Sequence, residues 1–191
     1  MNLPQSDYNC IGQVAKHCDN EKLCIAQEQS TEFDLEQLYC NDWTDILNIW
    51  NEVNNYDPEN PPLNYDLKYK LINGGTYENC AGKNVTFNGV KRVLVYYSYA
   101  RYKISSGDND TASGTVTKTS EFSIPKTRKE LEDISDEYRN MGMISFEKTI
   151  KFLCANKDVF NFFDAGTCKY KCGCDCDNNC NGTRAKGYGI R

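Results

Sequence analysis

The sequence predicts a mainly α-helical protein, a helical bundle with an extended β arm or hairpin and with irregular N- and C-terminal segments. Apolar residues recur at intervals of three and four in several segments of the 191-residue chain, as in amphipathic helices. Residues 111–120 differ, because they are rich in threonine and too poor in apolar residues to fold alone. With 39% hydrophobic residues, the chain can bury one core.

The first part of the chain, residues 1–40, is expected to form an N-terminal extension, and its residues 1–28 show only a weak pattern. It holds Cys10, Cys18 and Cys24 around His17, the only histidine. These cysteines lack the C-x₂₋₄-C spacing of structural zinc sites, so small buried thiols are favoured over a metal site. Thr31 is expected to start a helix, because threonine is a preferred N-cap and apolar residues follow it.

The clearest helix is expected to begin after Asn41 and Asp42. Its apolar stripe is Trp43, Ile46, Leu47, Trp50 and Val53. Two tryptophans on one stripe are more often core residues than a platform for a ligand.

A second, shorter helix is expected after the polar, proline-containing linker at residues 54–62. Leu63, Leu67 and Leu71 lie four residues apart, and Gly74 is placed to end the helix, since glycine tolerates a left-handed cap. The residues from 76 to 88 are expected to be a turn-rich connection.

The most apolar and aromatic stretch, residues 89–104, is expected to be the central element. Its pattern fits a helix or a strand, and its β-branched and aromatic residues favour the strand. About fourteen residues without glycine or proline exceed a usual strand, however, so a helix of about four turns is predicted.

Another long helix is expected after Thr127, which can form a capping box with Glu130. Gly142 interrupts its pattern, so one long helix and two helices with a kink near Gly142 are both possible. The stripe expected to face the core is Leu131, Ile134, Tyr138, Met141, Phe146, Ile150 and Leu153.

The threonine-rich arm is expected to span about residues 106–122. An exposed strand without a partner in its own chain can pair with the edge of a neighbour's sheet. The candidate contacts in this arm are Thr111, Gly114, Thr115, Val116 and Lys118.

The C-terminal segment, residues 166–191, is a cysteine-rich tail that becomes basic after Cys180. Its thiols could bind a soft metal ion such as zinc, form disulfides outside a reducing cytosol, or remain free. Their C-x-C-x-C order is not a zinc-finger spacing, and the basic end weakly indicates contact with an acidic surface or nucleic acid. The candidate metal ligands are Cys168, Cys172, Cys174, Cys176 and Cys180.

The distribution of charge and the missing motifs disfavour some classes of protein. The net charge of −5 divides unevenly, with 14 acidic and 4 basic residues up to residue 80 and 13 acidic and 18 basic residues after it. Such a division favours head-to-tail association of copies, although solvated faces explain it equally well.

The sequence shows no signal-peptide pattern and no membrane-span pattern, so we expect a protein made in a cytosol, with its eleven cysteines starting as thiols. It also has no P-loop, dinucleotide fingerprint, metalloprotease motif or nucleophile elbow, which disfavours an enzyme.

The order of four motifs resembles the head-to-tail connector (adaptor) proteins of tailed bacteriophages, and is most similar to those of crAss-like phages. The resemblance covers about residues 41–165, the expected connector domain. The motifs are Gly74-Gly75-Thr76-Tyr77, then Asn88-Gly89-Val90-Lys91 opening Tyr97-Ser98-Tyr99-Ala100-Arg101-Tyr102, then Thr111-Ala112-Ser113-Gly114-Thr115-Val116-Thr117-Lys118, then Tyr138-Arg139-Asn140-Met141-Gly142.

This resemblance implies a structural virion protein without catalytic activity, made in the host cytoplasm. Copies would form a twelve-fold ring in the neck, between the portal protein and the next ring of the neck or tail, without a membrane. DNA would pass through the lumen without sequence-specific contacts. Adaptor families use an extended arm for contact with subunits or portal, and here that arm would be residues 111–120. Arg101 would pair with a carboxylate of a neighbouring copy or, alternatively, form an ion pair within its own bundle.

Two other functions stay open at the level of the sequence. One is a metal-binding regulatory or nucleic-acid-binding module that uses the cysteine-rich tail. The other is an enzyme of an unrecognised kind, which no sequence motif supports.

Overall fold

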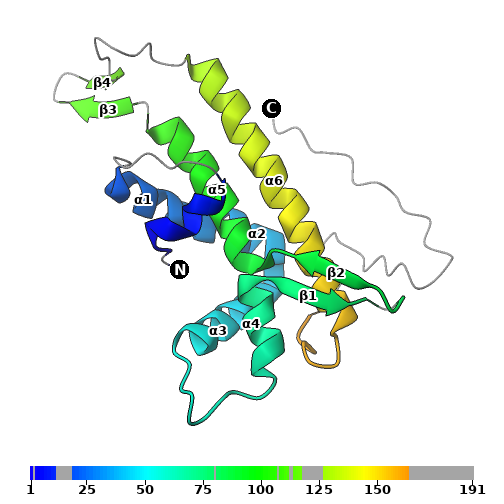
Figure 1. The fold of residues 1–191 in the computed structure, drawn as a ribbon. Helices are drawn as coiled ribbons and strands as arrows, with labels where there is room; N and C mark the ends of the chain where they lie inside the picture. Colours follow the sequence, from blue (N-terminus) through cyan, green and yellow to red (C-terminus); the bar gives the residue numbers. More distant parts are fainter. Residues whose placement is uncertain are drawn as a thin grey trace.

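Two long helices, α5 (Gly89–Ser105) and α6 (Arg128–Ala155), lie side by side and form the spine of the protein (Figure 1). The mainly helical class expected from the sequence is therefore confirmed. The computed structural model describes residues 1, 3–11, 19–79, 81–106, 108–111, 114–117 and 127–163.

The remaining elements surround this spine. In chain order they are η1 (Gln5–Ile11), α1 (Asn20–Ser30), η2 (Thr31–Leu35, a π-helical turn), α2 (Glu36–Tyr39), η3 (Cys40–Asp42), α3 (Trp43–Asn54), α4 (Tyr65–Asn73), β1 (Gly75–Glu78), β2 (Asn84–Phe87), β3 (Asp108–Thr111) and β4 (Gly114–Thr117).

Helix α5 is the central element, as expected. It contacts α1, α4, η1, η2 and α6, so it is buried on several sides at once. Residues that a strand pattern would place on one face, such as Val95 and Tyr99, are buried together with the helical set Val90, Val93 and Leu94. Burial on several sides is the physical reason why its sequence lacks a clear helical period.

Helix α6 begins at the predicted capping box and continues as one helix to Ala155 (Figure 1). The Thr127 side chain accepts a hydrogen bond from the backbone N–H of Glu130, whose carboxylate accepts one from the backbone N–H of Thr127 at 2.7 Å. Gly142 serves a different purpose from a kink: a Cβ at this position would lie 2.7 Å from Cε2 of Tyr97 on α5. Glycine therefore lets the two long helices approach closely.

The expected stripe of α6 is partly wrong. Met141, expected in the core, is exposed, whereas the small residues Ser135, Gly142 and Ser145 are buried. These small residues fill the side of α6 that packs closely on α5, and the larger Met141 is left on the outside.

A β-hairpin replaces the turn-rich connection expected at residues 76–88. Strands β1 and β2 pair antiparallel, with Thr76 opposite Thr86 and Tyr77 opposite Val85. Only Tyr77 and Phe87 are buried in these strands, and both rings pack on Phe152 of α6 at centroid distances of 5.2 and 4.3 Å. One buried residue per four-residue strand gives too weak an alternation to be recognised in the sequence.

Among the first forty residues, expected as an irregular extension, the described ones are mostly helical and several of them belong to the core. The helix start expected at Thr31 is wrong, because α1 begins at Asn20 after an N-cap at Asp19 and continues into η2. The Thr31 hydroxyl instead donates to the carbonyl of Gln27 at 2.8 Å. Tyr8 and Leu35 are fully buried in the same hydrophobic cluster as α5.

Helices α3 and α4 form the end of the molecule away from β3 and β4 (Figure 1). Trp43 and Trp50 of α3 are buried, as expected. Gly74 ends α4 with a φ of 85°, also as expected. Leu63, expected in this helix, precedes α4 instead, and its side chain is 82% exposed. Among the described helices, none has the length and apolar character needed to cross a membrane.

Candidate subunit interface

The arm predicted from the sequence is a two-stranded hairpin. Strand β3 pairs antiparallel with β4, with Asp108 opposite Thr117 and Thr111 opposite Gly114. Figure 1 shows the hairpin beyond the C-terminal end of α5. Because the sheet holds two strands, each strand has a second edge with no strand paired to it among the described residues. Such an edge can accept a strand of another chain.

Four of the candidate contact residues lie in this hairpin: Thr111 ends β3, and Gly114, Thr115 and Val116 lie in β4. The fifth, Lys118, lies outside the described residues. The structure thus brings four of the predicted residues together on one projecting element.

Arg101, the remaining candidate contact, pairs within its own chain. Its Nε donates to Oδ2 of Asp34 at 2.6 Å and its Nη2 donates to Oδ1 at 2.9 Å. The guanidinium also lies 5.7 Å from the ring centroid of Phe33, within the range of a cation–π interaction. The sequence leaves two roles for Arg101, an ion pair with a neighbouring copy and an ion pair within its own bundle. The structure shows the ion pair within the bundle.

The uneven charge of the chain is partly balanced inside one subunit. Besides the Asp34–Arg101 pair, Nζ of Lys91 on α5 lies 2.9 Å from Oδ2 of Asp7 in η1. Both pairs join an acidic residue of the first forty to a basic residue of α5. These charges are therefore already paired and add little to attraction between copies.

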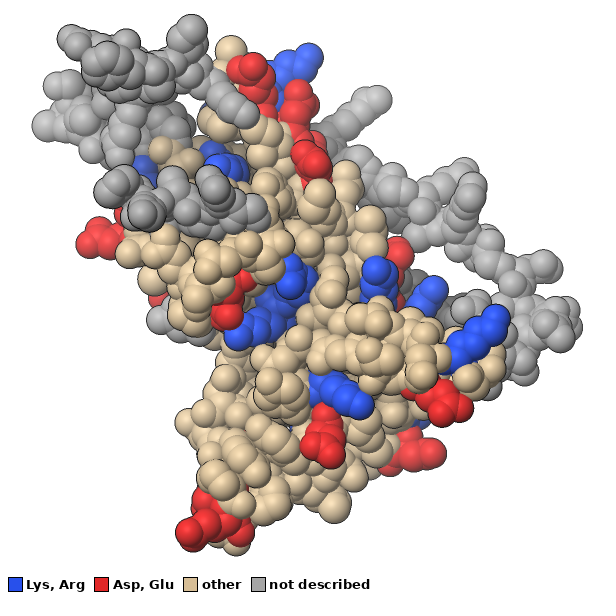
Figure 2. Space-filling view, viewed as in Figure 1, with Lys and Arg blue, Asp and Glu red and all other residues tan. Residues whose placement is uncertain are grey.

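Uncharged surface remains exposed at the α3–α4 end of the molecule (Figure 2). Here Tyr56 and Tyr65 stack with ring centroids 4.1 Å apart, and Tyr69 follows 6.0 Å from Tyr65. Leu63 lies in the connection between α3 and α4 and is largely exposed. The large apolar side chains exposed in the described residues are Ile25, Phe33, Tyr56, Leu63, Tyr69, Met141 and Ile144. Aromatic residues on the surface are typical of contact sites between subunits.

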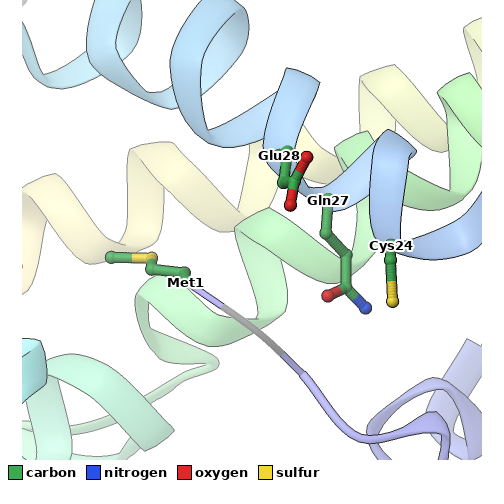
Figure 3. Close-up of a pocket in the computed structure, with 4 residues that line it drawn as sticks. All are labelled: Met1, Cys24, Gln27 and Glu28. Atoms are coloured by element: carbon green, nitrogen blue, oxygen red, sulfur yellow. The ribbon is translucent and has the colours of Figure 1, made fainter.

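A pocket of about 160 Å³ lies beside α1, lined by Met1, Cys24, Gln27 and Glu28 (Figure 3). The buried Gln27 donates from Nε2 to the carbonyl of Leu3 at 3.1 Å and accepts at Oε1 from the N–H of Leu3 at 3.0 Å. Its amide therefore holds the N-terminal segment on α1 and is not offered to a ligand.

The five candidate metal ligands, Cys168, Cys172, Cys174, Cys176 and Cys180, lie outside the described residues. Within the described part of the chain, no group of three or more His, Cys, Asp or Glu residues could hold a metal ion. Cys10, Cys24 and Cys40 are free and exposed. Cys154 on α6 is disulfide-bonded. The metal-binding alternative thus gains no support from the described residues.

Comparison with protein families gives a match. A family model described as a family of unknown function (DUF6712) matches residues 59–172, which include α4, both hairpins, α5 and α6. No curated protein and no solved structure matches the chain.

Proposed function

The chain belongs to the DUF6712 family, a family of unknown function, and we propose that it is a structural ring protein of the neck of a tailed-bacteriophage virion. In this proposal, twelve copies form a closed ring between the portal protein and the next neck or tail ring. DNA passes through the lumen without sequence-specific contacts. The protein is made in the host cytoplasm, becomes part of the virion and catalyses no reaction.

The observation that carries this proposal is the projecting β3–β4 hairpin. Each of its strands has a backbone edge with no strand paired to it among the described residues. Backbone N–H and C=O groups at such an edge can pair with a neighbour's strand, so one copy can bind another through this hairpin. The threonine-rich sequence of this hairpin is also the most distinctive part of the resemblance to adaptor proteins, together with the Tyr97–Tyr102 segment of α5.

The exposed aromatic residues at the opposite end supply a second surface for assembly. A ring requires two different contact surfaces on each copy, because head-to-tail contacts close into a ring when the rotation fits. Tyr56 and Tyr69 are exposed, and the half-buried Tyr65 stacks on Tyr56. A tyrosine side chain combines apolar area with a hydroxyl group, which suits a contact between subunits.

Size-exclusion chromatography with light scattering tests the proposal, on the full chain alone and with the portal protein encoded in the same genome. We expect a ring-sized species in at least one of the two samples. Val116→Pro is expected to reduce ring formation, because proline cannot donate in the strand that pairs Val116 with Asn109. Val116→Thr is the matched control and should assemble normally. Monomers in both samples of the unmodified chain would contradict the proposal, and so would a gene that lies apart from portal and capsid genes.

A further inference from the structure

The outer side of α6 carries a row of six exposed residues that the core does not use. They follow one another at intervals of four, four, three, four and three, which keeps them on one face of a helix. Met141 and Ile144, at the centre of the row, are 36% and 54% exposed. We call this row the α6 stripe: Asp133, Glu137, Met141, Ile144, Lys148 and Lys151.

The charges of the α6 stripe are ordered along the helix. Its N-terminal third is acidic, its centre is apolar and its C-terminal third is basic. Asp133 and Lys151 each lie nine residues from Gly142, and Glu137 and Lys148 lie five and six residues from it. A second copy of the stripe laid antiparallel would therefore place carboxylates opposite ammonium groups on both sides of the centre. A parallel copy would place like charges together.

Interactions within one subunit do not explain why the acidic and basic residues of the α6 stripe are separated along the helix. The helix dipole favours acids at the N-terminus and bases at the C-terminus, but its effect is confined to the first and last turns, whereas Glu137 and Lys148 lie further inside. Neighbours within the stripe carry like charges, since Asp133 and Glu137 lie four residues apart, and Lys148 and Lys151 lie three apart. Like charges at this spacing repel each other in a single helix.

Other side chains in the described residues leave these charges unpaired. Two further charged residues lie at one edge of the stripe: Lys129 is four residues before Asp133, and Glu147 is four residues before Lys151. Each has the opposite charge to the stripe residue that follows it. They form no ion pair with Asp133 or Lys151 in the structure; the exposed ion pair on α6 joins Arg128 to Glu132 instead. The four charges of the stripe are thus available to a partner.

We propose that the α6 stripe binds the α6 stripe of a second copy of this chain, antiparallel and related by a two-fold axis. Met141 and Ile144 of both copies meet at the axis, and four carboxylate–ammonium pairs flank them. This contact goes beyond the ring and does not depend on it, because a ring joins two different surfaces whereas a two-fold contact joins one surface to itself. One helix face buries less than the roughly 800 Å² per partner of a standard interface.

The dimer is consequently weak and sensitive to salt. We expect a dissociation constant on the order of 100 μM at low ionic strength, the range for small, transient contacts. Raising the salt concentration to about 0.5 M should weaken the dimer, because exposed charges are screened over a few ångströms at that ionic strength.

Sedimentation equilibrium on four forms of the full chain tests the proposal. The acid-reversed variant (Asp133→Lys with Glu137→Lys) and the base-reversed variant (Lys148→Glu with Lys151→Glu) should each dimerise at least tenfold more weakly than the unmodified chain. An equimolar mixture of the two should regain the unmodified affinity, because every pair is again attractive. Glu59→Lys with Glu78→Lys makes the same charge change as the acid-reversed variant at exposed sites off the stripe, so this control should dimerise normally.

A fully swapped variant, with all four substitutions in one chain, tests the antiparallel direction. It should dimerise with itself as the unmodified chain does, yet form no mixed dimer with the unmodified chain. Circular dichroism should be the same for all variants, since every substituted side chain is exposed. Mixed dimers that are stronger than either homodimer would show a parallel contact and overturn the proposal. Equal affinity of all variants, or monomers throughout, would overturn it too.

Discussion

Asp34 and Arg101 join the N-terminal segment to the central helix through two parallel hydrogen bonds, from Nε to Oδ2 at 2.6 Å and from Nη2 to Oδ1 at 2.9 Å. The Asp34 side chain is 9% exposed and that of Arg101 is 23% exposed. A bidentate pair with so little access to water is stronger than the usual surface ion pair. It fixes η2 on α5.

Removal of Arg101 should therefore destabilise the subunit. Arg101→Ala leaves the Asp34 carboxylate nearly buried without its partner, and we expect a loss of about 2 kcal/mol in the free energy of unfolding. Urea denaturation measures the loss. Arg128→Ala, which breaks the exposed pair with Glu132, is the matched control and should cost less than about 0.5 kcal/mol. Equal losses in the two variants would contradict the internal role of Arg101.

Gly142→Ala tests the close approach of the two long helices. Alanine normally stabilises a helix relative to glycine, by about 1 kcal/mol. Here the added methyl group would lie 2.7 Å from the buried ring of Tyr97, and such overpacking costs about 1 to 3 kcal/mol. We expect a net decrease in melting temperature. Asn140→Ala, at an exposed position of the same helix, should leave the temperature unchanged or raise it slightly. An increase for Gly142→Ala would show that the helices can move apart at no cost.

Tyr8 makes the stability depend on pH in alkaline solution. Its hydroxyl is buried and lies 2.7 Å from Oγ of Ser98, and burial raises the pKa of Tyr8 to about 12. The folded state thus favours the neutral phenol more than the unfolded state does. Its stabilising contribution is complete below about pH 10, the unfolded pKa, and is lost as the pH rises toward 12. Burial raises the pKa of Tyr39 as well, which acts in the same direction.

Urea denaturation at several pH values measures this effect. The free energy of unfolding should fall by about 2 kcal/mol because of Tyr8 between pH 10 and pH 12. Tyr8→Phe should reduce the slope in this range, while the exposed Tyr69→Phe should leave it unchanged. The prediction fails if Tyr8→Phe and the unmodified chain lose stability in parallel.

Local sequence patterns are informative where one face of a helix meets the core. The stripe with Trp43 and Trp50 predicts α3, and the capping box of Thr127 predicts the start of α6. The length of the 89–104 segment predicts α5, although burial on several sides removes its helical period.

Contacts between distant parts of the chain are not predictable from local patterns. Tyr8 reaches Ser98, ninety residues away, so nothing near Tyr8 in the sequence indicates that it is a core residue. The side of α6 that packs on α5 contains small residues such as Gly142. The apolar stripe therefore wrongly predicts that Met141 faces the core, whereas this residue is exposed. For the candidate interface, the sequence indicates the hairpin but not that Asp34 already binds Arg101.

We propose that this chain acts as one copy in a symmetric ring of the virion neck. Electron cryomicroscopy of the full chain, incubated with the portal protein encoded in the same genome, would show such a ring. We predict a closed ring on the portal, with each β3–β4 hairpin in contact with a neighbouring copy or with the portal. Single subunits that bear no symmetric neighbours, with the hairpin packed on their own helices, would contradict it.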